Sequence, residues 1–247
     1  MEHNARLSLI IPIYNAEKFI LESLLRLTAW RLKTSYLVQI ILVNDGSIDS
    51  TKKIIEEYIR TEDSSIKLLS YNVNKGKGYA VKKGMLEATG EFRIFTDSDI
   101  PYGVDIFDKI IYYLDFKEFD VCIGNRKSES SKYVQEISKI RKISSKIFTL
   151  IISRYVVTGV KDTQCGLKGF RAEIAKKLFS NLNINGFAFD VEVLYYCYKY
   201  DYEIKKIPVV FQGNSISTIR LSKVSLQMLQ DIIYLPIKYH FFKKHQI

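Results

Sequence analysis

Phe92-Arg93-Ile94-Phe95-Thr96-Asp97-Ser98-Asp99 is the stretch that decides the fold. A short, largely apolar run of this kind predicts a buried strand, and it ends at two carboxylates. Residues two apart in an extended chain point the same way, so Asp97 and Asp99 can converge on one ion. Two carboxylates without histidine favour a hard cation, Mg²⁺ or Mn²⁺, completed by water and phosphate oxygens. An Asp-x-Asp motif can equally cap the following helix, so the motif alone leaves both interpretations open.

Similar apolar runs recur on both sides of this stretch. They predict strands at residues 7–13, 38–43, 66–70, 92–96, 121–124 and 204–211. Helical spacing of apolar residues predicts helices at residues 16–32, 50–60, 78–88, 104–116, 134–155 and 190–200. Residues 162–170 are predicted to form a compact loop. This alternation predicts an α/β fold, a mostly parallel sheet flanked by helices. The polar turns 14–17, 44–47 and 97–99 each follow a strand, so we expect them to share the carboxyl edge of the sheet, where such folds bind ligands.

The chain is expected to form one domain over residues 1–212, followed by an amphipathic helical tail over residues 213–247. Its 247 residues are 47% hydrophobic and 26% charged, which argues against disorder. The three cysteines have no paired spacing, which excludes a disulfide scaffold and a cysteine-based zinc finger. The three histidines lie at the two ends of the chain, which excludes a Ser–His–Asp triad. No apolar run reaches the length of a transmembrane helix, and residues 1–6 lack a signal-peptide core. We therefore expect a cytoplasmic protein, held to a membrane only peripherally.

The formal net charge of +10 suggests an anionic partner such as nucleic acid, phospholipid or a phosphorylated substrate. Two further motifs fit a phosphorylated ligand. Asp45 ends a strand, where a carboxylate can accept hydrogen bonds from a base or ribose, although Asn-Asp-Gly-Ser is also strong turn chemistry. Residues 74–78, Asn-Lys-Gly-Lys-Gly, place Lys77 and backbone amides at a helix start, which suits a phosphate or diphosphate.

Four motifs in this order resemble family 2 glycosyltransferases with the GT-A fold. They are residues 11–17 (IPIYNAE), 43–47 (VNDGS), 74–78 (NKGKG) and 97–99 (DSD). The resemblance implies a nucleotide-sugar site in residues 1–99 and an acceptor-binding half in residues 100–212. It assigns the base and ribose to Pro12, Tyr14, Glu17 and Asp45. It assigns the donor sugar and a metal-bound diphosphate to Asp97 and Asp99.

The second half resembles the polyprenyl-phosphate branch of that family, especially dolichyl-phosphate β-glucosyltransferases. The likeness is carried by residues 162–170 (DTQCGLKGF), 189–192 (FDVE), 217–220 (STIR) and 226–231 (LQMLQD), and it covers about residues 7 to 235. It implies inverting, metal-dependent transfer of glucose from UDP-glucose to a polyprenyl or dolichyl phosphate. By motif position, the lipid phosphate would meet Arg126, Arg141 and Arg220, and Lys168 could add a point charge.

Two departures separate the chain from its relatives. Pro101 stands where dolichyl-phosphate mannose synthases carry a metal-binding glutamine, which weakens a mannose donor. The N-terminal membrane helix of eukaryotic glucosyltransferases is not found, so we expect the body to contact the anionic membrane surface. Residues 139–154 and 232–244 combine basic and apolar or aromatic residues and fit helices lying on anionic lipid. A helix packed on the core with a solvated basic edge is the alternative.

A polyprenyl phosphate is already anionic and needs no strong general base. A sugar hydroxyl would need one, and the candidates are Asp162, Asp190 and Glu192. The rival functions are a GDP-mannose-dependent transferase, a transferase acting on a sugar hydroxyl in surface polysaccharide synthesis, a nucleotidyltransferase, and a non-catalytic basic module for membrane or nucleic acid. We expect no nucleic-acid partner, because Asp45, Asp97 and Asp99 would repel its phosphates.

Overall fold

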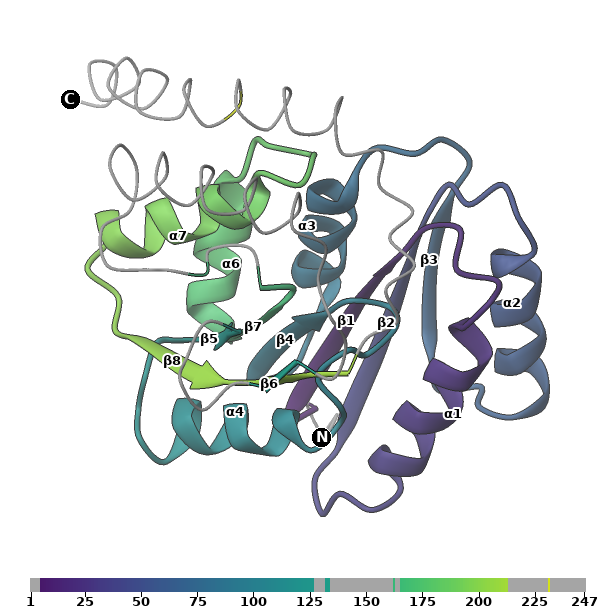
Figure 1. Cartoon of the computed structure of the whole chain (residues 1–247), viewed down its shortest axis with the longest axis horizontal. Helices are drawn as coiled ribbons and strands as arrows, with labels where there is room; N and C mark the ends of the chain where they lie inside the picture. Colours follow the sequence, from purple (N-terminus) through teal and green to yellow (C-terminus); the bar gives the residue numbers. More distant parts are fainter. Residues whose placement is uncertain (1–4, 127–131, 134–161, 163–164, 213–230, 232–247) are drawn as a thin grey trace.

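A seven-stranded sheet in the order β3-β2-β1-β4-β7-β5-β8 forms the centre of the protein (Figure 1). The structure is a computed structural model that describes residues 5–126, 132–133, 162, 165–212 and 231. The strands of this sheet are β1 (Leu7–Ile13), β2 (Val38–Asp45), β3 (Lys67–Tyr71), β4 (Phe92–Thr96), β5 (Val121–Asn125), β7 (Leu167–Arg171) and β8 (Ile204–Pro208). Two short strands, β6 (Lys132–Tyr133) and β9 (Val210–Phe211), pair separately.

Helices cover both faces of the sheet, as expected for strands that are apolar on both sides. The described helices are α1 (Ile20–Arg31), α2 (Thr51–Thr61), α3 (Lys77–Glu87), α4 (Ile106–Asp115), α6 (Ala172–Asn181) and α7 (Phe189–Lys199). Successive side chains of β1 point to opposite faces: Ile10 joins the core under α3, α6 and α7, whereas Leu9 and Ile11 join the core under α1, α2 and α4. The prediction of an α/β fold with helices on both sides of the sheet is therefore confirmed.

The carboxyl ends of β1, β2 and β4 lie at one edge of the sheet, because these strands run parallel. In the register, Ile13 pairs with Asn44 and Asp45 pairs with Tyr71. The loops after β1 and β2 therefore begin side by side, and the 97–99 turn begins at the end of β4 on the other side of β1. The predicted convergence of three polar turns on one edge is confirmed.

The second half differs from the prediction in one important respect. Leu167–Arg171, expected within a compact loop, is the strand β7, which lies between β4 and β5 and runs antiparallel to both. Its sequence, Leu-Lys-Gly-Phe-Arg, has no β-branched residue and carries a glycine, so it gives no strand signal. The α6 helix was not expected either, and the predicted strand 204–211 is divided at Val209 into β8 and β9.

Several other expectations concern residues outside the described part of the chain, namely the helix at 134–155 and the tail at 213–247, apart from Asp231. Among the described residues, no helix is both long enough and apolar enough to cross a membrane.

Candidate functional site

Hydrogen bonds join the β1–α1 loop to the β2–α2 loop and make them one rim of the site. The backbone N–H of Asn15 donates to Ser47 Oγ at 3.0 Å, and the N–H of Ile48 donates back to Asn15 Oδ1 at 3.0 Å. The N–H of Ala16 donates to Thr51 Oγ1 at 2.7 Å. The two loops therefore form a single preorganised wall at the carboxyl edge of the sheet.

The residues expected to hold a base and ribose are distributed over this wall. Tyr14 projects from it with 43% of its surface exposed, so its ring is available to a ligand. Glu17 accepts a hydrogen bond from the backbone N–H of Ser50 at 3.0 Å, which fixes its carboxylate at the start of α2. Pro12 is buried within β1 and can act there only by shaping the strand end.

Asp45 builds the next part of the site, the loop that leads into α3. Its carboxylate accepts the backbone N–H of Lys75 at 2.8 Å and that of Gly76 at 2.9 Å, and its carbonyl accepts Asn74 Nδ2 at 3.0 Å. Gly76 has a φ of +101°, and a Cβ there would lie 2.4 Å from the carbonyl oxygen of Asn185. Asp45 therefore holds the 74–76 loop in the conformation that places the N-terminus of α3, a position favourable for phosphate.

Asp97, Asp99 and Lys77 meet at the end of β4. Lys77, the first residue of α3, forms an ion pair with Asp97. Burial alone would lower the pKa of Lys77, but the neighbouring carboxylates Asp97, Asp190 and Asp99 outweigh it and the pKa is raised. Burial and the adjacent Asp97 charge raise the pKa of Asp99 to about 6. The site thus holds two carboxylates whose mutual repulsion one lysine partly offsets.

These two carboxylates fit a divalent cation. A hard cation would relieve the repulsion that raises the Asp99 pKa, and carboxylate oxygens are the ligands that Mg²⁺ and Mn²⁺ prefer. Within the described residues no group of three His, Cys, Asp or Glu side chains is placed to hold a metal. A cation here would therefore take its remaining ligands from water and the phosphates of a substrate.

A buried ion pair lies behind this site. Lys168 of β7 is fully buried, and its ammonium group bonds to Asp190 of α7 and to the carbonyl oxygen of Cys165, the latter at 2.9 Å. Burial raises the pKa of Asp190, although Lys168 and Lys77 oppose that shift. Lys168, expected at an acceptor phosphate, is thus placed in the interior, where it neutralises Asp190.

Arg126 and Asp162 form a second pair, beyond the end of β5. Nε and Nη2 of Arg126 donate to the two oxygens of Asp162 at 2.9 and 2.8 Å, and the backbone N–H of Arg126 donates at 2.8 Å. The Asp162 side chain is 3% exposed and that of Arg126 is 28% exposed. Asp162, expected to be catalytic, is therefore committed to orienting Arg126, which still reaches the surface. Arg141 and Arg220, expected beside it, lie outside the described residues.

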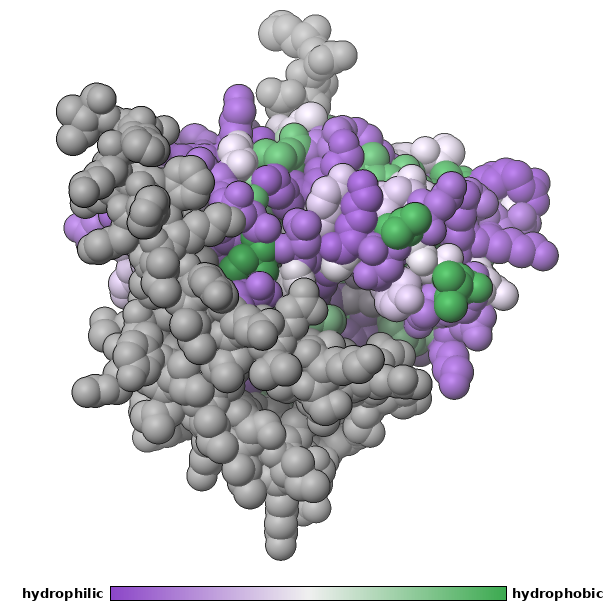
Figure 2. Space-filling model, turned by 90° about the horizontal axis from the view of Figure 1, so that it is seen from above, coloured by the Kyte–Doolittle hydropathy of each residue, from purple (hydrophilic) through white to green (hydrophobic). Residues whose placement is uncertain are grey.

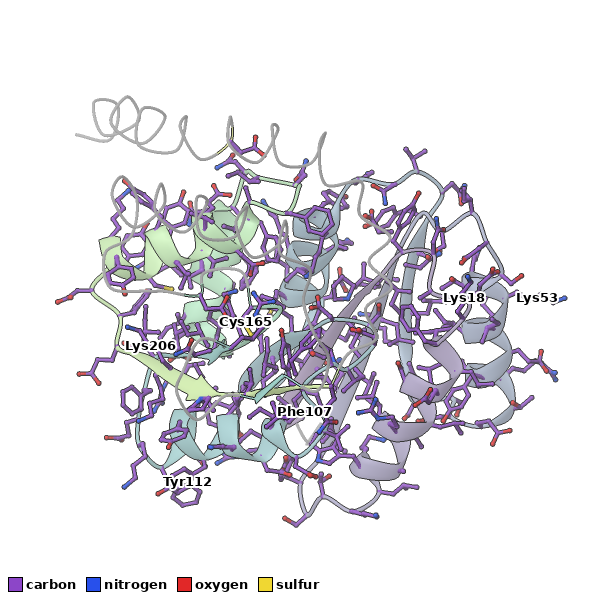
Figure 3. All side chains as sticks on the ribbon, in the orientation of Figure 1. Lys18, Lys53, Phe107, Tyr112, Cys165 and Lys206 are labelled. Atoms are coloured by element: carbon purple, nitrogen blue, oxygen red, sulfur yellow. The ribbon has the colours of Figure 1, made fainter. Side chains whose placement is uncertain are left out.

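Sequence reasoning missed two residues of this region, Gly166 and Tyr102. A Cβ on Gly166 would lie 2.0 Å from Asp97 Oδ2, so the carboxylate occupies the space of the missing side chain. Tyr102 is 7% exposed and lies near Cys165 and Arg126; burial, then Cys165, raises its pKa. Figure 3 shows Cys165 near the middle of the molecule, far from Lys18 and Lys53 at the α1–α2 side. The 162–170 motif contains Gly166 and could have indicated that it belongs to the site. No sequence motif indicated Tyr102.

Seen from above, the described surface is largely hydrophilic, with hydrophobic residues scattered over it rather than gathered in one broad patch (Figure 2).

Comparisons with known proteins agree with this geometry. Residues 8–179 match the family described as Glycosyl transferase family 2. The chain is 34% identical over 249 residues to a dolichyl-phosphate beta-glucosyltransferase of Dictyostelium discoideum, covering 96% of this chain and 75% of the relative. It is 30% identical over 249 residues to the enzyme of that name from Drosophila melanogaster, covering 94% and 75%.

Solved structures show the same fold at low sequence identity. Glucosyl-3-phosphoglycerate synthase from Mycobacterium tuberculosis, in complex with Mn²⁺, UDP and glucosyl-3-phosphoglycerate, superposes with a TM-score of 0.68 at 16% identity, covering 94% of this chain and 80% of that one. Staphylococcus aureus TarS in complex with UDP-GlcNAc gives a TM-score of 0.60 at 17% identity, covering 93% and 66%. The fold is therefore GT-A-like.

Proposed function

This chain belongs to glycosyltransferase family 2, and on that premise we propose that it transfers glucose from UDP-glucose to a polyprenyl phosphate of the dolichyl type. One observation carries the proposal: the three candidate bases, Asp162, Asp190 and Glu192, are each paired with a cation or with backbone N–H groups. This arrangement suits an acceptor that is already ionised. The similarity to dolichyl-phosphate beta-glucosyltransferases supports the donor sugar and the lipid acceptor.

The donor would lie along the carboxyl edge of the sheet. Tyr14, Glu17 and Asp45, with Pro12 beneath them, would receive the base and ribose. Lys77 and the amides of the 74–78 loop would receive the diphosphate, since the N-terminus of α3 and a lysine both attract anions. Asp97 and Asp99 would hold Mg²⁺ or Mn²⁺, which would supply charge neutralisation at the departing diphosphate.

The acceptor would approach from the side of Arg126. Two N–H groups of its guanidinium bond to Asp162, so the fork is held in place while the remaining donors can bind a phosphate oxygen. We propose Arg141 and Arg220 as further phosphate ligands by motif position. The ammonium group of Lys168 is buried, so it would not contact the acceptor phosphate directly. Its effect on the site would be indirect, through its bond to Asp190, whose charge acts on Lys77.

The reaction needs positioning and charge stabilisation more than proton transfer. A phosphate oxygen of the lipid attacks the anomeric carbon while the bond from that carbon to the UDP β-phosphate oxygen breaks, and the electron pair leaves with UDP. In-line attack inverts the configuration, so an α-linked donor gives a β-linked lipid phosphosugar. No proton has to be removed from the acceptor.

A sugar-hydroxyl acceptor is less well served by these residues. It would need a general base within hydrogen-bond reach. Asp162 bonds to Arg126, Asp190 bonds to Lys168, and Glu192 accepts the backbone N–H groups of residues 183 and 184. Each of the three carboxylates is therefore already hydrogen-bonded within the protein, which leaves it poorly placed to accept a proton from a substrate hydroxyl.

Because the proposed acceptor is a lipid, we propose that transfer takes place at the cytoplasmic face of a membrane. We propose that residues 1–212 form the catalytic domain, with a donor half over 1–99 and an acceptor half over 100–212. Residues 139–154 and the tail 213–247 would supply the contact with anionic lipid.

A donor-by-acceptor test decides among these functions. The protein is incubated with Mn²⁺ or Mg²⁺, polyprenyl phosphate, and either labelled UDP-glucose or labelled GDP-mannose, and label is counted in the organic phase. We expect organic-phase label from UDP-glucose, and its loss when EDTA is added. Label from GDP-mannose alone would change the donor. No organic-phase label, with glucose transferred to a sugar acceptor and UDP released, would refute the lipid acceptor.

A further inference from the structure

Gly166 and Asp97 lie next to each other at the ends of the neighbouring strands β7 and β4. Thr96 of β4 pairs with Leu167 of β7, and the next step of this antiparallel register places Asp97 opposite Gly166. A Cβ on Gly166 would lie 2.0 Å from Asp97 Oδ2, 2.5 Å from Cγ and 2.6 Å from Oδ1. The whole carboxylate group therefore occupies the volume that any other residue at position 166 would fill.

The backbone at Gly166 cannot easily move away from the carboxylate. The strand that begins at Leu167 is paired on both sides, with β4 and with β5. One residue further on, Lys168 is anchored by the Asp190 carboxylate and by the carbonyl oxygen of Cys165 at 2.9 Å. A side chain at position 166 would therefore displace the Asp97 carboxylate rather than the strand.

Displacement of Asp97 would reach the rest of the site through Lys77. The Asp97 carboxylate is held on one side by its ion pair with Lys77 and is closely approached on another by Gly166. Moving it would disturb that pair and change the position of the Asp97 oxygens relative to Asp99. No φ in the left-handed region is required at position 166, so alanine is excluded by space alone.

We propose that Gly166 is a positioning residue of this transferase, which fixes the Asp97 carboxylate for the divalent cation and the diphosphate of the donor. The inference rests on the proposed function of Asp97. Residues that orient a metal ligand typically change metal affinity roughly 10- to 100-fold when they are replaced.

The test compares Gly166→Ala with a matched control, Gly186→Ala. A Cβ on Gly186 meets its nearest atom, Asp231 Oδ2, at 3.9 Å, so alanine fits there without displacement. UDP binding is measured by titration calorimetry over a series of Mn²⁺ concentrations. Thermal unfolding is measured for the same proteins, for Asp97→Ala, and for the double variant that combines Gly166→Ala with Asp97→Ala.

We expect Gly166→Ala to require roughly 10- to 100-fold more Mn²⁺ for half-maximal UDP binding, and Gly186→Ala to match the wild type. We also expect Gly166→Ala to lower the unfolding temperature in the wild-type background but not in the Asp97→Ala background, where the space is free. Unchanged Mn²⁺ dependence, or an equal loss of unfolding temperature in both backgrounds, would overturn the positioning role. Absence of UDP binding by the wild type would instead refute the proposed donor, while the thermal comparison would still test the contact.

Discussion

The Glu192 side chain is fully buried in α7, and its replacement by glutamine distinguishes a structural carboxylate from a catalytic base. Its two oxygens accept the backbone N–H of Asn183 at 3.1 and 3.0 Å, and one also accepts the N–H of Ile184 at 2.8 Å. These bonds hold the loop before α7. The next residue of that loop, Asn185, accepts the N–H of Tyr79 at 3.2 Å, so the loop also supports the start of α3.

The size of the effect follows from these hydrogen bonds. Glutamine can keep an oxygen where it accepts both N–H groups, but its amide nitrogen then faces the N–H of Asn183, so one of the three charge-assisted contacts is lost. Such a bond contributes about 1.5–3 kcal/mol to the free energy of unfolding. For a chain of this size that corresponds to a fall of roughly 3–12 °C in the unfolding temperature. The fold should survive, because domain stabilities are typically about 5–15 kcal/mol.

Urea unfolding and steady-state kinetics of Glu192→Gln provide the assay, with Glu56→Gln as the control. The Glu56 side chain is 55% exposed, and its replacement should change stability by less than about 0.5 kcal/mol. We expect Glu192→Gln to lose stability and to raise the KM for the donor while kcat changes little. A kcat loss of roughly 100-fold or more with unchanged stability would refute this reasoning and identify Glu192 as a base.

Three further predictions concern other carboxylates and Arg126. Asp99→Asn should abolish transfer while leaving the unfolding temperature within a few degrees of the wild type; full activity in an extraction assay would refute the metal-site assignment. Arg126→Ala should raise the KM for polyprenyl phosphate more than that for the nucleotide sugar, and an equal rise in both would refute the acceptor role. Burial alone would raise the pKa of Asp63, but hydrogen bonds from Arg31 and Ser65 outweigh burial and lower the pKa. Above pH 5 the free energy of unfolding of the wild type should therefore exceed that of Asp63→Asn by about 1.5–3 kcal/mol. This difference should disappear as the pH falls below about 4, and urea unfolding at several pH values would measure it.

The sheet of the first half could be predicted because its signals are local. The buried strands β1, β2 and β4 are continuous apolar runs that end at polar turns, and their predicted bounds agree with the structure to within two residues. The parallel arrangement then placed Tyr14, Asp45 and Asp97 at one edge without any knowledge of side-chain contacts.

The partners of the site residues could not be predicted, because they come from distant parts of the chain. Asp45 bonds to backbone amides 30 and 31 residues later, and Arg126 bonds to a carboxylate 36 residues later. The burial of Lys168 depends on Asp190, which is 22 residues away. A lysine is rarely buried without such a partner, so its sequence context indicates solvent or a ligand.

The position of β7 in the sheet has a consequence for how the protein is made. β4 pairs with β1 on one side, but its other edge is completed by β7, more than 70 residues further along the chain. Until the ribosome has released residue 171, the strand Phe92–Thr96 exposes unpaired backbone groups beside apolar side chains. The nascent chain therefore passes through a stage in which the edge of the sheet is prone to aggregation. The yield of the protein on expression should depend on chaperones that cover this edge during synthesis.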